Sequence, residues 1–270
     1  MRAADRDRYV AVLYAPEAKR ADLLALYAFD AEIGAIRDRV SEPLPGEMRL
    51  QWWRDVLAAS DAASAGGHPV ATALLEAIRR NRLPTDALQN YLDARIFDLY
   101  DDPMPTRGDL EGYCGETAAA IIQLSCLVLD PQVAARTSDL SGHAGCAYAM
   151  TRLLLSLPKH RRRGQCYVPK DILAAAGTTP QEFLTSDGGP NAPRAVAAMI
   201  ALAREHLQAF ERGAVAMPAS VRAAFLPVAT TAAILSKMAG REEDLLTASL
   251  DIAAWRKHWP IFRRAWLGWA

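Results

Sequence analysis

The stretch that decides the fold, TRLLLSLPKHRRRGQCYVP, runs from Thr151 to Pro169. Its first part has the leucine spacing of a helix, but the ring of Pro158 disfavours helical dihedral angles at the residue before it. We therefore expect the helix to end near Leu157. The basic run KHRRR follows at residues 159–163. The sequence thus predicts a helix that leads into a basic loop.

The same stretch resembles a signature of the squalene/phytoene synthase family, which has the form TNxLRDxxEDxxRGRxYxP. The positions that match it without a gap include Thr151, Arg163, Gly164, Tyr167 and Pro169. The acidic positions do not match, because Ser156, Lys159 and His160 stand where the family has aspartate or glutamate. The frame of the signature is kept, and its acids are replaced.

A second stretch, YAFDAEIGAIRD at residues 27–38, resembles the first acidic helix of the same family, YAFxRxxDDxxD. Gly34 and Ala35 replace the paired aspartates of that pattern. The acids that remain on this helix are Asp30, Glu32 and Asp38. They are either the remnant of a cation site or solvated ion-pair partners of basic residues on the same helix, and the second interpretation is favoured.

These replacements bear on the family's chemistry, because a diphosphate leaves only when its charge is neutralised, as Mg²⁺ held by carboxylates does. Positions 34 and 38, like positions 156 and 160, share a helix face, but only one of the four residues is acidic. A break before Pro158 would also place positions 156 and 160 on different elements. We expect no metal site, no cofactor and no catalytic residue, and Mg²⁺ only if prenyl transfer survives.

The basic run allows two interpretations. Its lysine and arginines can bind a phosphate, an anionic lipid or an acidic partner surface. Equally, a basic run is typical of a solvated loop after a helix end, where cations favour the helix dipole. The candidate anion- or partner-binding residues are Lys159, His160, Arg161, Arg162, Arg163 and Tyr167.

A narrower resemblance lies in DRVSEPLPGEMRLQWWRD, residues 38–55. A subgroup of the family, represented by a mitochondrial complex I assembly factor, also has VSE after the first helix and an MRxQxW segment downstream. This resemblance implies a non-catalytic protein that assists assembly of complex I, the respiratory NADH:quinone oxidoreductase. It would act by binding complex I subunits or assembly intermediates, or an isoprenoid or anionic lipid.

Two alternatives stay open. The first is a diverged prenyltransferase that condenses farnesyl or geranylgeranyl diphosphate, with Asp30, Glu32 and Asp38 as unusual metal ligands. One acidic helix lacks the opposed carboxylate wall that orients both the ion cluster and the leaving group. The second alternative is a cavity that holds an isoprenoid, such as a quinone tail, without chemistry.

Composition sets broader limits. The 270 residues are 51% hydrophobic and 23% charged, which is enough to bury a substantial core. The formal net charge is zero, which argues against a nucleic-acid partner. Four cysteines without CxxC spacing favour buried thiols in a reducing compartment.

The sequence shows no secretory signal and no long apolar run, so we expect no membrane-spanning segment and a cytoplasmic protein. Peripheral attachment to the inner face of the membrane is left open.

Apolar residues recur mostly at three- and four-residue spacing, which predicts a nearly all-helical chain. The predicted helices are 17–40, 46–64, 69–81, 85–101, 108–129, 132–157, 191–216, 220–238 and 251–268. Because no interdomain linker interrupts them, we expect a single domain over residues 1–270. The family resemblance implies an all-α bundle of the isoprenoid synthase type around a central cavity.

Aromatic residues mark two further segments. Trp52 and Trp53 suggest a stacking platform or helix packing, and packing in the core is favoured. Near the carboxy terminus, aromatic residues three and four apart alternate with basic ones, as in an interfacial or partner-binding helix. They are Trp255, Trp259, Phe262, Trp266 and Trp269. Pro260 is expected to interrupt this helix, and a helix that closes the bundle is the slightly favoured interpretation.

Overall fold

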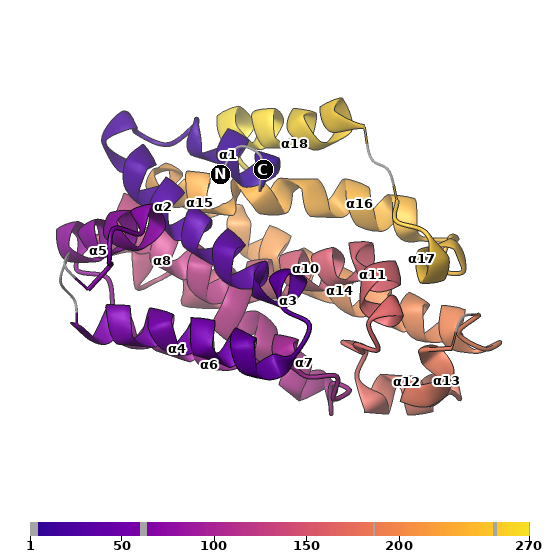
Figure 1. Cartoon of the computed structure of the whole chain (residues 1–270). Coiled ribbons are helices and arrows are strands. Elements are labelled where there is room, and N and C mark those ends of the chain that lie inside the picture. The colour runs from indigo at the N-terminus through magenta and orange to yellow at the C-terminus, as the bar shows by residue number, and fades with distance from the viewer. Residues whose placement is uncertain (1–4, 60–63, 186, 251–252, 270) are drawn as a thin grey trace.

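The computed structural model describes residues 5–59, 64–185, 187–250 and 253–269. Within these ranges the chain forms helices and no strand, as predicted. Figure 1 shows the helices gathered into one bundle, with the long helices α10 (Ser138–Leu155) and α14 (Ala192–Ala214) through its middle. These two helices pack against each other more extensively than any other described pair.

The helices follow one another along the chain, some directly and some through short turns. The first half of the chain forms α1 (Arg6–Val12), α2 (Glu17–Gly34), α3 (Ile36–Arg39), α4 (Pro43–Ala59), α5 (Pro69–Asn81), α6 (Thr85–Ala94), η1 (Arg95–Leu99), α7 (Arg107–Cys114), η2 (Gly115–Ala119) and α8 (Ala120–Leu129). Besides α10 and α14, the second half forms α9 (Pro131–Ala134), α11 (Leu157–Arg162), α12 (Lys170–Ala176), α13 (Pro180–Phe183), η3 (Ala219–Val221), α15 (Arg222–Phe225), η4 (Leu226–Thr230), α16 (Thr231–Met238), α17 (Asp244–Thr247) and α18 (Ala254–Leu267).

The break predicted near Leu157 is present, but the loop predicted after it is wrong. Helix α10 ends at Leu155, and the chain turns helical again at once as α11. Pro158 lies in the first turn of α11, where its missing N–H has no partner to lose and its fixed φ suits the helix. The basic run is therefore helical.

Most other helix predictions hold, with differences at the ends. The range 69–81 coincides with α5. The short helices α1, α12, α13 and α17 were not predicted, because segments of seven residues or fewer show too little periodicity. Helix α18 continues through Pro260, which was expected to interrupt it. The predicted positions 60–63 and 251–252 lie outside the described residues.

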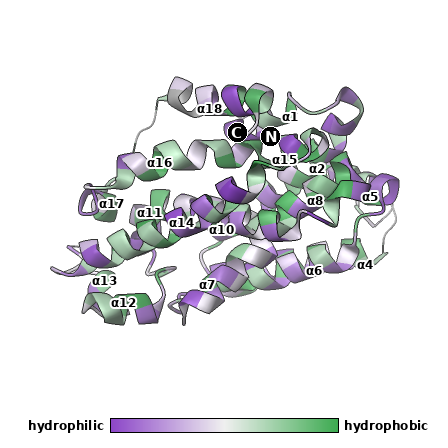
Figure 2. Ribbon diagram, turned by 180° about the vertical axis from the view of Figure 1, so that it is seen from behind, coloured by the Kyte–Doolittle hydropathy of each residue, from purple (hydrophilic) through white to green (hydrophobic). Residues whose placement is uncertain are grey.

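Two hydrophobic clusters form the core. One gathers around α10, α14 and α16, and the other around α2, α5, α6 and α8. Figure 2 shows hydrophobic and hydrophilic residues alternating along the helices that surround them. All four cysteines are buried, as predicted. Trp53 belongs to the core at 3% exposure, whereas Trp52 lies at the surface at 36% exposure, so the packing prediction holds for one of the two.

Two helical stretches in the described ranges are long and apolar enough to cross a membrane by length and composition alone. They are Arg107–Leu129 and Ala219–Met238. In their most apolar windows, 56% and 61% of the residues are buried inside the fold. Core helices of a globular protein pass the same test, and both stretches pack in that way here.

The close contact between α10 and η2 depends on Gly145. A Cβ atom at this position would lie against the backbone of Ala119, well inside van der Waals contact. Gly142, one turn earlier in α10, has open space around the corresponding point. A methyl group would therefore clash with η2 at position 145 and would fit without a clash at position 142.

We expect Gly145→Ala to lower the free energy of unfolding by about 1–3 kcal/mol or more, because α10 and η2 must separate. Gly142→Ala is the matched control and should raise it by about 0.5–1 kcal/mol, since alanine favours a helix over glycine. Urea denaturation of both variants measures the difference. Equal stabilities of the two variants would contradict the proposed contact.

Candidate functional site

A polar cavity of about 600 Å³ opens among α1, α2, α10 and α11, as the family resemblance implied. Its acidic, basic and histidine lining residues are Asp5, Arg8, Asp30, Glu32, Asp38, Arg39, Arg95, Arg152 and His160. Residues of both signature stretches are among them. Residues from the two altered signature stretches therefore meet at this cavity.

The positions that lost their acids still line this cavity. Gly34 and Ala35 line it from the end of α2, and Ser156 and His160 line it at the start of α11. The His160 N–H donates to the Ser156 carbonyl at 3.0 Å, so these two positions stay one helical turn apart. The prediction that the break separates positions 156 and 160 is wrong, because this hydrogen bond spans it. The side chains have changed while the backbone kept its place.

Asp38 is the point where the two signature stretches meet. Lys159 Nζ lies 2.7 Å from its carboxylate, and Arg163 Nη1 lies 2.6 Å from it. Burial alone would raise the pKa of Asp38, but the hydrogen bonds from Lys159 and Arg163 lower it below its ordinary value. Two cations of one signature thus bind the single acid that the other signature keeps at its aspartate positions.

The residues present do not fit a Mg²⁺ cluster, which needs several oxygen ligands around each ion. In the part of the chain that the structure describes, no three His, Cys, Asp or Glu residues come together closely enough to hold a metal ion. The carboxylate of Glu32 lies 3.0 Å from His68 Nε2, and that of Asp38 is paired with Lys159 and Arg163. These acids already have partners.

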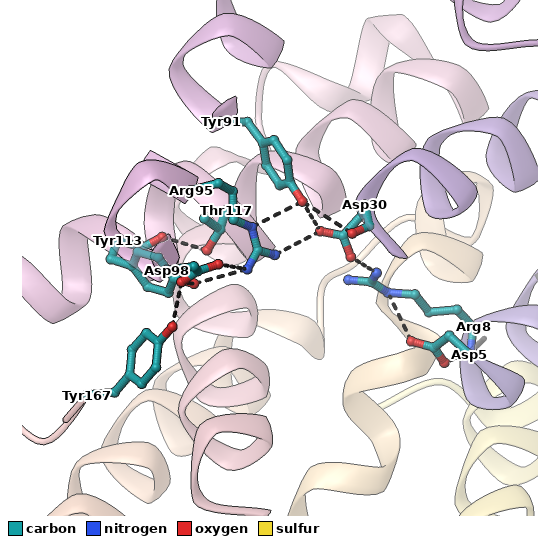
Figure 3. A network of polar contacts seen from close by, with 9 residues as sticks. All are labelled: Asp5, Arg8, Asp30, Tyr91, Arg95, Asp98, Tyr113, Thr117 and Tyr167. Atoms are coloured by element: carbon teal, nitrogen blue, oxygen red, sulfur yellow. Dashed lines mark hydrogen bonds and ion pairs between the residues drawn. The ribbon is translucent and has the colours of Figure 1, made fainter. Parts of the chain in front are cut away.

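Asp30 lies deeper, at 7% exposure, between two arginines (Figure 3). Arg8 Nη1 donates to one carboxylate oxygen, and Arg95 Nη2 donates to the other at 3.1 Å. The Tyr91 hydroxyl also donates to Asp30, at 2.5 Å. The expectation of a solvated ion pair is therefore wrong for Asp30, because its partners reach it inside the bundle.

Figure 3 shows that the same network continues from Arg95 to Asp98. Arg95 Nη1 donates to one carboxylate oxygen of Asp98 at 3.1 Å. The hydroxyls of Tyr113 and Tyr167 donate to the other at 2.7 and 2.6 Å. Tyr167, predicted as an anion- or partner-binding residue, thus serves a buried carboxylate of the protein itself.

The charges of this network stabilise one another. Burial alone would raise the pKa of Asp30, but the guanidinium charges of Arg8 and Arg95 lower it well below its ordinary value. Conversely, burial would lower the pKa of Arg8, and the Asp30 carboxylate raises it above its ordinary value. All three groups therefore stay ionised at neutral pH.

The rest of the basic run has varied surroundings. Arg161 is buried and donates to the backbone carbonyls of Phe183, Thr185 and Leu246. It fixes the turns around α13 and α17 instead of facing a ligand. Burial lowers the pKa of His160 to about 4, so its ring is neutral at pH 7. Arg162 is exposed on the last turn of α11.

Four cavity arginines were not among the predicted site residues: Arg8, Arg39, Arg95 and Arg152. Arg152 lies inside the quoted signature, at the position where the family pattern has asparagine, so a signal for it was present. Arg8 and Arg95 are 22 and 65 residues from their common partner Asp30, and no local pattern links them. Within the described residues, Arg39 and Arg152 have no carboxylate within ion-pair distance.

The bundle and its cavity define the class, an all-helical isoprenoid synthase fold. The structure matches the squalene synthase HpnC from Alicyclobacillus acidocaldarius with a TM-score of 0.74 at 20% identity, over 89% of this chain and 90% of that one. The squalene/phytoene synthase family model matches residues 1–263, and the chain belongs to this family.

Two kinds of relative are similar in sequence. NADH dehydrogenase (ubiquinone) complex I, assembly factor 6 from Bos taurus is 28% identical over 273 residues, covering 96% of this chain and 81% of the relative. Presqualene diphosphate synthase from Zymomonas mobilis is 27% identical over 177 residues, covering 63% of this chain and 58% of the enzyme. The resemblance to the assembly factor extends over more of the chain.

We expect Asp30→Asn to lower the free energy of unfolding at pH 7 by about 3–5 kcal/mol, because Arg8 and Arg95 are left buried without their carboxylate. The pKa of Asp30 is depressed in the fold, so its contribution is full above the ordinary carboxyl pKa of about 4 and is lost as pH falls below it. Urea denaturation of wild type and variant across this range measures both effects.

Asp38→Asn is the matched control, since it removes the same charge from a partly exposed pair and should cost about 0.2–1 kcal/mol. The interpretation fails if Asp30→Asn costs no more than this control. It also fails if the difference between wild type and Asp30→Asn stays constant from neutral pH to well below the carboxyl pKa.

Proposed function

We propose that this protein is a non-catalytic member of the family, which binds an anionic isoprenoid lipid in its cavity and assists assembly of complex I. One observation carries the proposal: Lys159 and Arg163 bind Asp38, the one acid retained at the signature aspartate positions. A carboxylate held by two tethered cations is not free to collect divalent ions. Without them no divalent ion neutralises the charge that a diphosphate gains as it leaves.

The cavity lining supports the choice of ligand. Arg39 and Arg152 line the cavity without a carboxylate partner among the described residues, and arginine recognises phosphate oxygens in a forked geometry. The lining also includes apolar residues, among them Ala31, Val70 and Leu153. A ligand with an anionic head and an apolar chain matches both parts, as an isoprenoid phosphate does.

The assembly role rests on the relatives. The proteins named complex I assembly factor 6 resemble this chain over nearly its full length, at 28% identity for the bovine protein. The partners would then be complex I subunits or assembly intermediates. We place the protein in the cytoplasm, at the inner face of the membrane, where such intermediates are accessible.

The alternative, a diverged prenyltransferase, draws on the partial match to presqualene diphosphate synthase. Incubation of the purified protein with Mg²⁺ and labelled farnesyl or geranylgeranyl diphosphate distinguishes the two. We expect no release of diphosphate above the uncatalysed rate. Release at a catalytic rate would refute the non-catalytic assignment.

Ligand binding is tested with farnesyl diphosphate in metal-free buffer. We expect Arg152→Ala to weaken binding roughly tenfold, since it removes one charged hydrogen-bond donor to the phosphate. Arg162→Ala removes the same charge from an exposed position outside the cavity and should leave the affinity unchanged. Calorimetry measures both, and equal affinities of the two variants would exclude the cavity as the site.

The assembly role is tested in the native host. Deletion of the gene should lower the amount of assembled complex I and its NADH:quinone activity, and the intact gene on a plasmid should restore both. Unchanged levels of the assembled complex in the deletion strain would remove the assembly role, whether or not the cavity binds a lipid.

A further inference from the structure

Helix α18 has two apolar faces, and the bundle uses one of them. Ile261 and Trp269 are buried at 0% and 7% exposure, and Ala265 packs between them against the core. The Trp269 ring meets Phe210 edge to face at 5.3 Å between centroids, and Arg222 Nη1 donates to the Ala265 carbonyl at 3.2 Å. Figure 1 shows α18 along the outer edge of the molecule, beside α1. The helix is therefore anchored from one side.

The other face is aromatic and faces solvent. We call Trp255, Trp259, Phe262 and Trp266 the aromatic stripe; their exposures are 66%, 60%, 45% and 71%. Their spacing of four, three and four residues places them along one side of the helix. Centroids lie 5.7 Å apart for Trp259 and Phe262 and 6.4 Å apart for Phe262 and Trp266. The stripe is an exposed aromatic surface along one side of α18.

The neighbouring turn between α1 and α2 extends this surface. Tyr14 and Val10 line a hollow of about 620 Å³ together with Trp255, Trp259 and Phe262. Next to Tyr14, Leu13 is 49% exposed, and Arg20 holds the turn by donating to the carbonyls of Leu13 and Ala15 at 2.9 and 3.0 Å. Two segments far apart in the sequence thus present apolar side chains together.

The charge of α18 indicates what kind of partner its exposed surface would bind. The helix sequence AWRKHWPIFRRAWL contains four arginines and lysines and one histidine, and no aspartate or glutamate, although the whole chain has zero formal net charge. The carboxylate of Asp7, whose side chain is 12% exposed, lies 3.8 Å from His258 Nε2. Among the side chains that the structure describes on this helix, Arg263 is exposed, so basic charge stands beside the aromatic stripe.

We propose that α18 docks the protein on an anionic bilayer surface, with the aromatic stripe at the boundary between headgroups and acyl chains. Tryptophan concentrates at that depth, because its ring is apolar and its N–H still reaches water. Basic residues on the same helix meet the lipid phosphates, and amphipathic helices of this composition lie in the plane of the interface. This surface is separate from the cavity, so the inference does not depend on the cavity ligand.

The test is sedimentation of the full chain with phosphatidylcholine vesicles, with and without phosphatidylglycerol. Wild type should bind the anionic vesicles roughly tenfold or more above the neutral ones, and added salt should weaken binding. The double variant Trp259→Ser with Trp266→Ser should lose roughly tenfold or more of this binding. Arg263→Glu, at an exposed position of the same helix, should lower binding to anionic vesicles only.

The control is Leu44→Ser with Met48→Ser, which removes two side chains of 67% and 66% exposure on α4, away from α18 in Figures 1 and 2. It should bind like wild type, and all variants should keep the wild-type circular dichroism and melting temperature. Equal binding to both vesicle types, or equal losses in control and stripe variants, would overturn the proposal. A third outcome would also overturn it: wild type is a dimer, the stripe variant is a monomer, and neither protein binds vesicles. In that case a second copy of the chain would cover the stripe.

Discussion

A carboxylate enclosed in a helical bundle is stable only beside compensating positive charge, and Asp30 receives that charge from two sides. Arg8 comes from α1 and Arg95 from η1, so one buried anion joins three separate segments of the chain. Arg95 also donates a hydrogen bond to Asp98, and the hydroxyls of Tyr113 and Tyr167 donate to the same carboxylate. Ion pairs and hydrogen bonds therefore help to fix the inner wall of the cavity, in addition to apolar packing.

The same rule acts at Asp38 with a different functional result. A synthase of this fold would neutralise its acids with metal ions, which can also bind a substrate. Here the ammonium of Lys159 and the guanidinium of Arg163 do so, and both are tethered to the chain. A tethered cation satisfies the acid but cannot bridge it to a diphosphate as a divalent ion can. Under the function proposed above, the cavity would bind an anionic ligand without activating it.

Most of the fold could be predicted from the sequence, and part of the site could not. Long periodic segments such as residues 69–81 predict their helices well, because periodicity is a local property. The basic run was expected in a loop, since Pro158 stops a helix and can equally start one. The pairing of Asp38 with Lys159 joins residues 121 apart, and that of Asp30 with Arg95 joins residues 65 apart. Composition and spacing do not reveal such contacts, although the two signatures showed which acids had gone.

For protein engineering, the retained geometry of the cavity wall is the most useful feature. Gly34, Ala35, Ser156 and His160 still line the space where their acidic counterparts would stand, and a Cβ built on Gly34 would come no closer than 4.0 Å to its nearest neighbour. Carboxylates grafted at these points would meet an intact backbone frame. A metal site of the kind that the family signatures describe could therefore be tested in this fold by exchanging side chains, without redesigning the backbone.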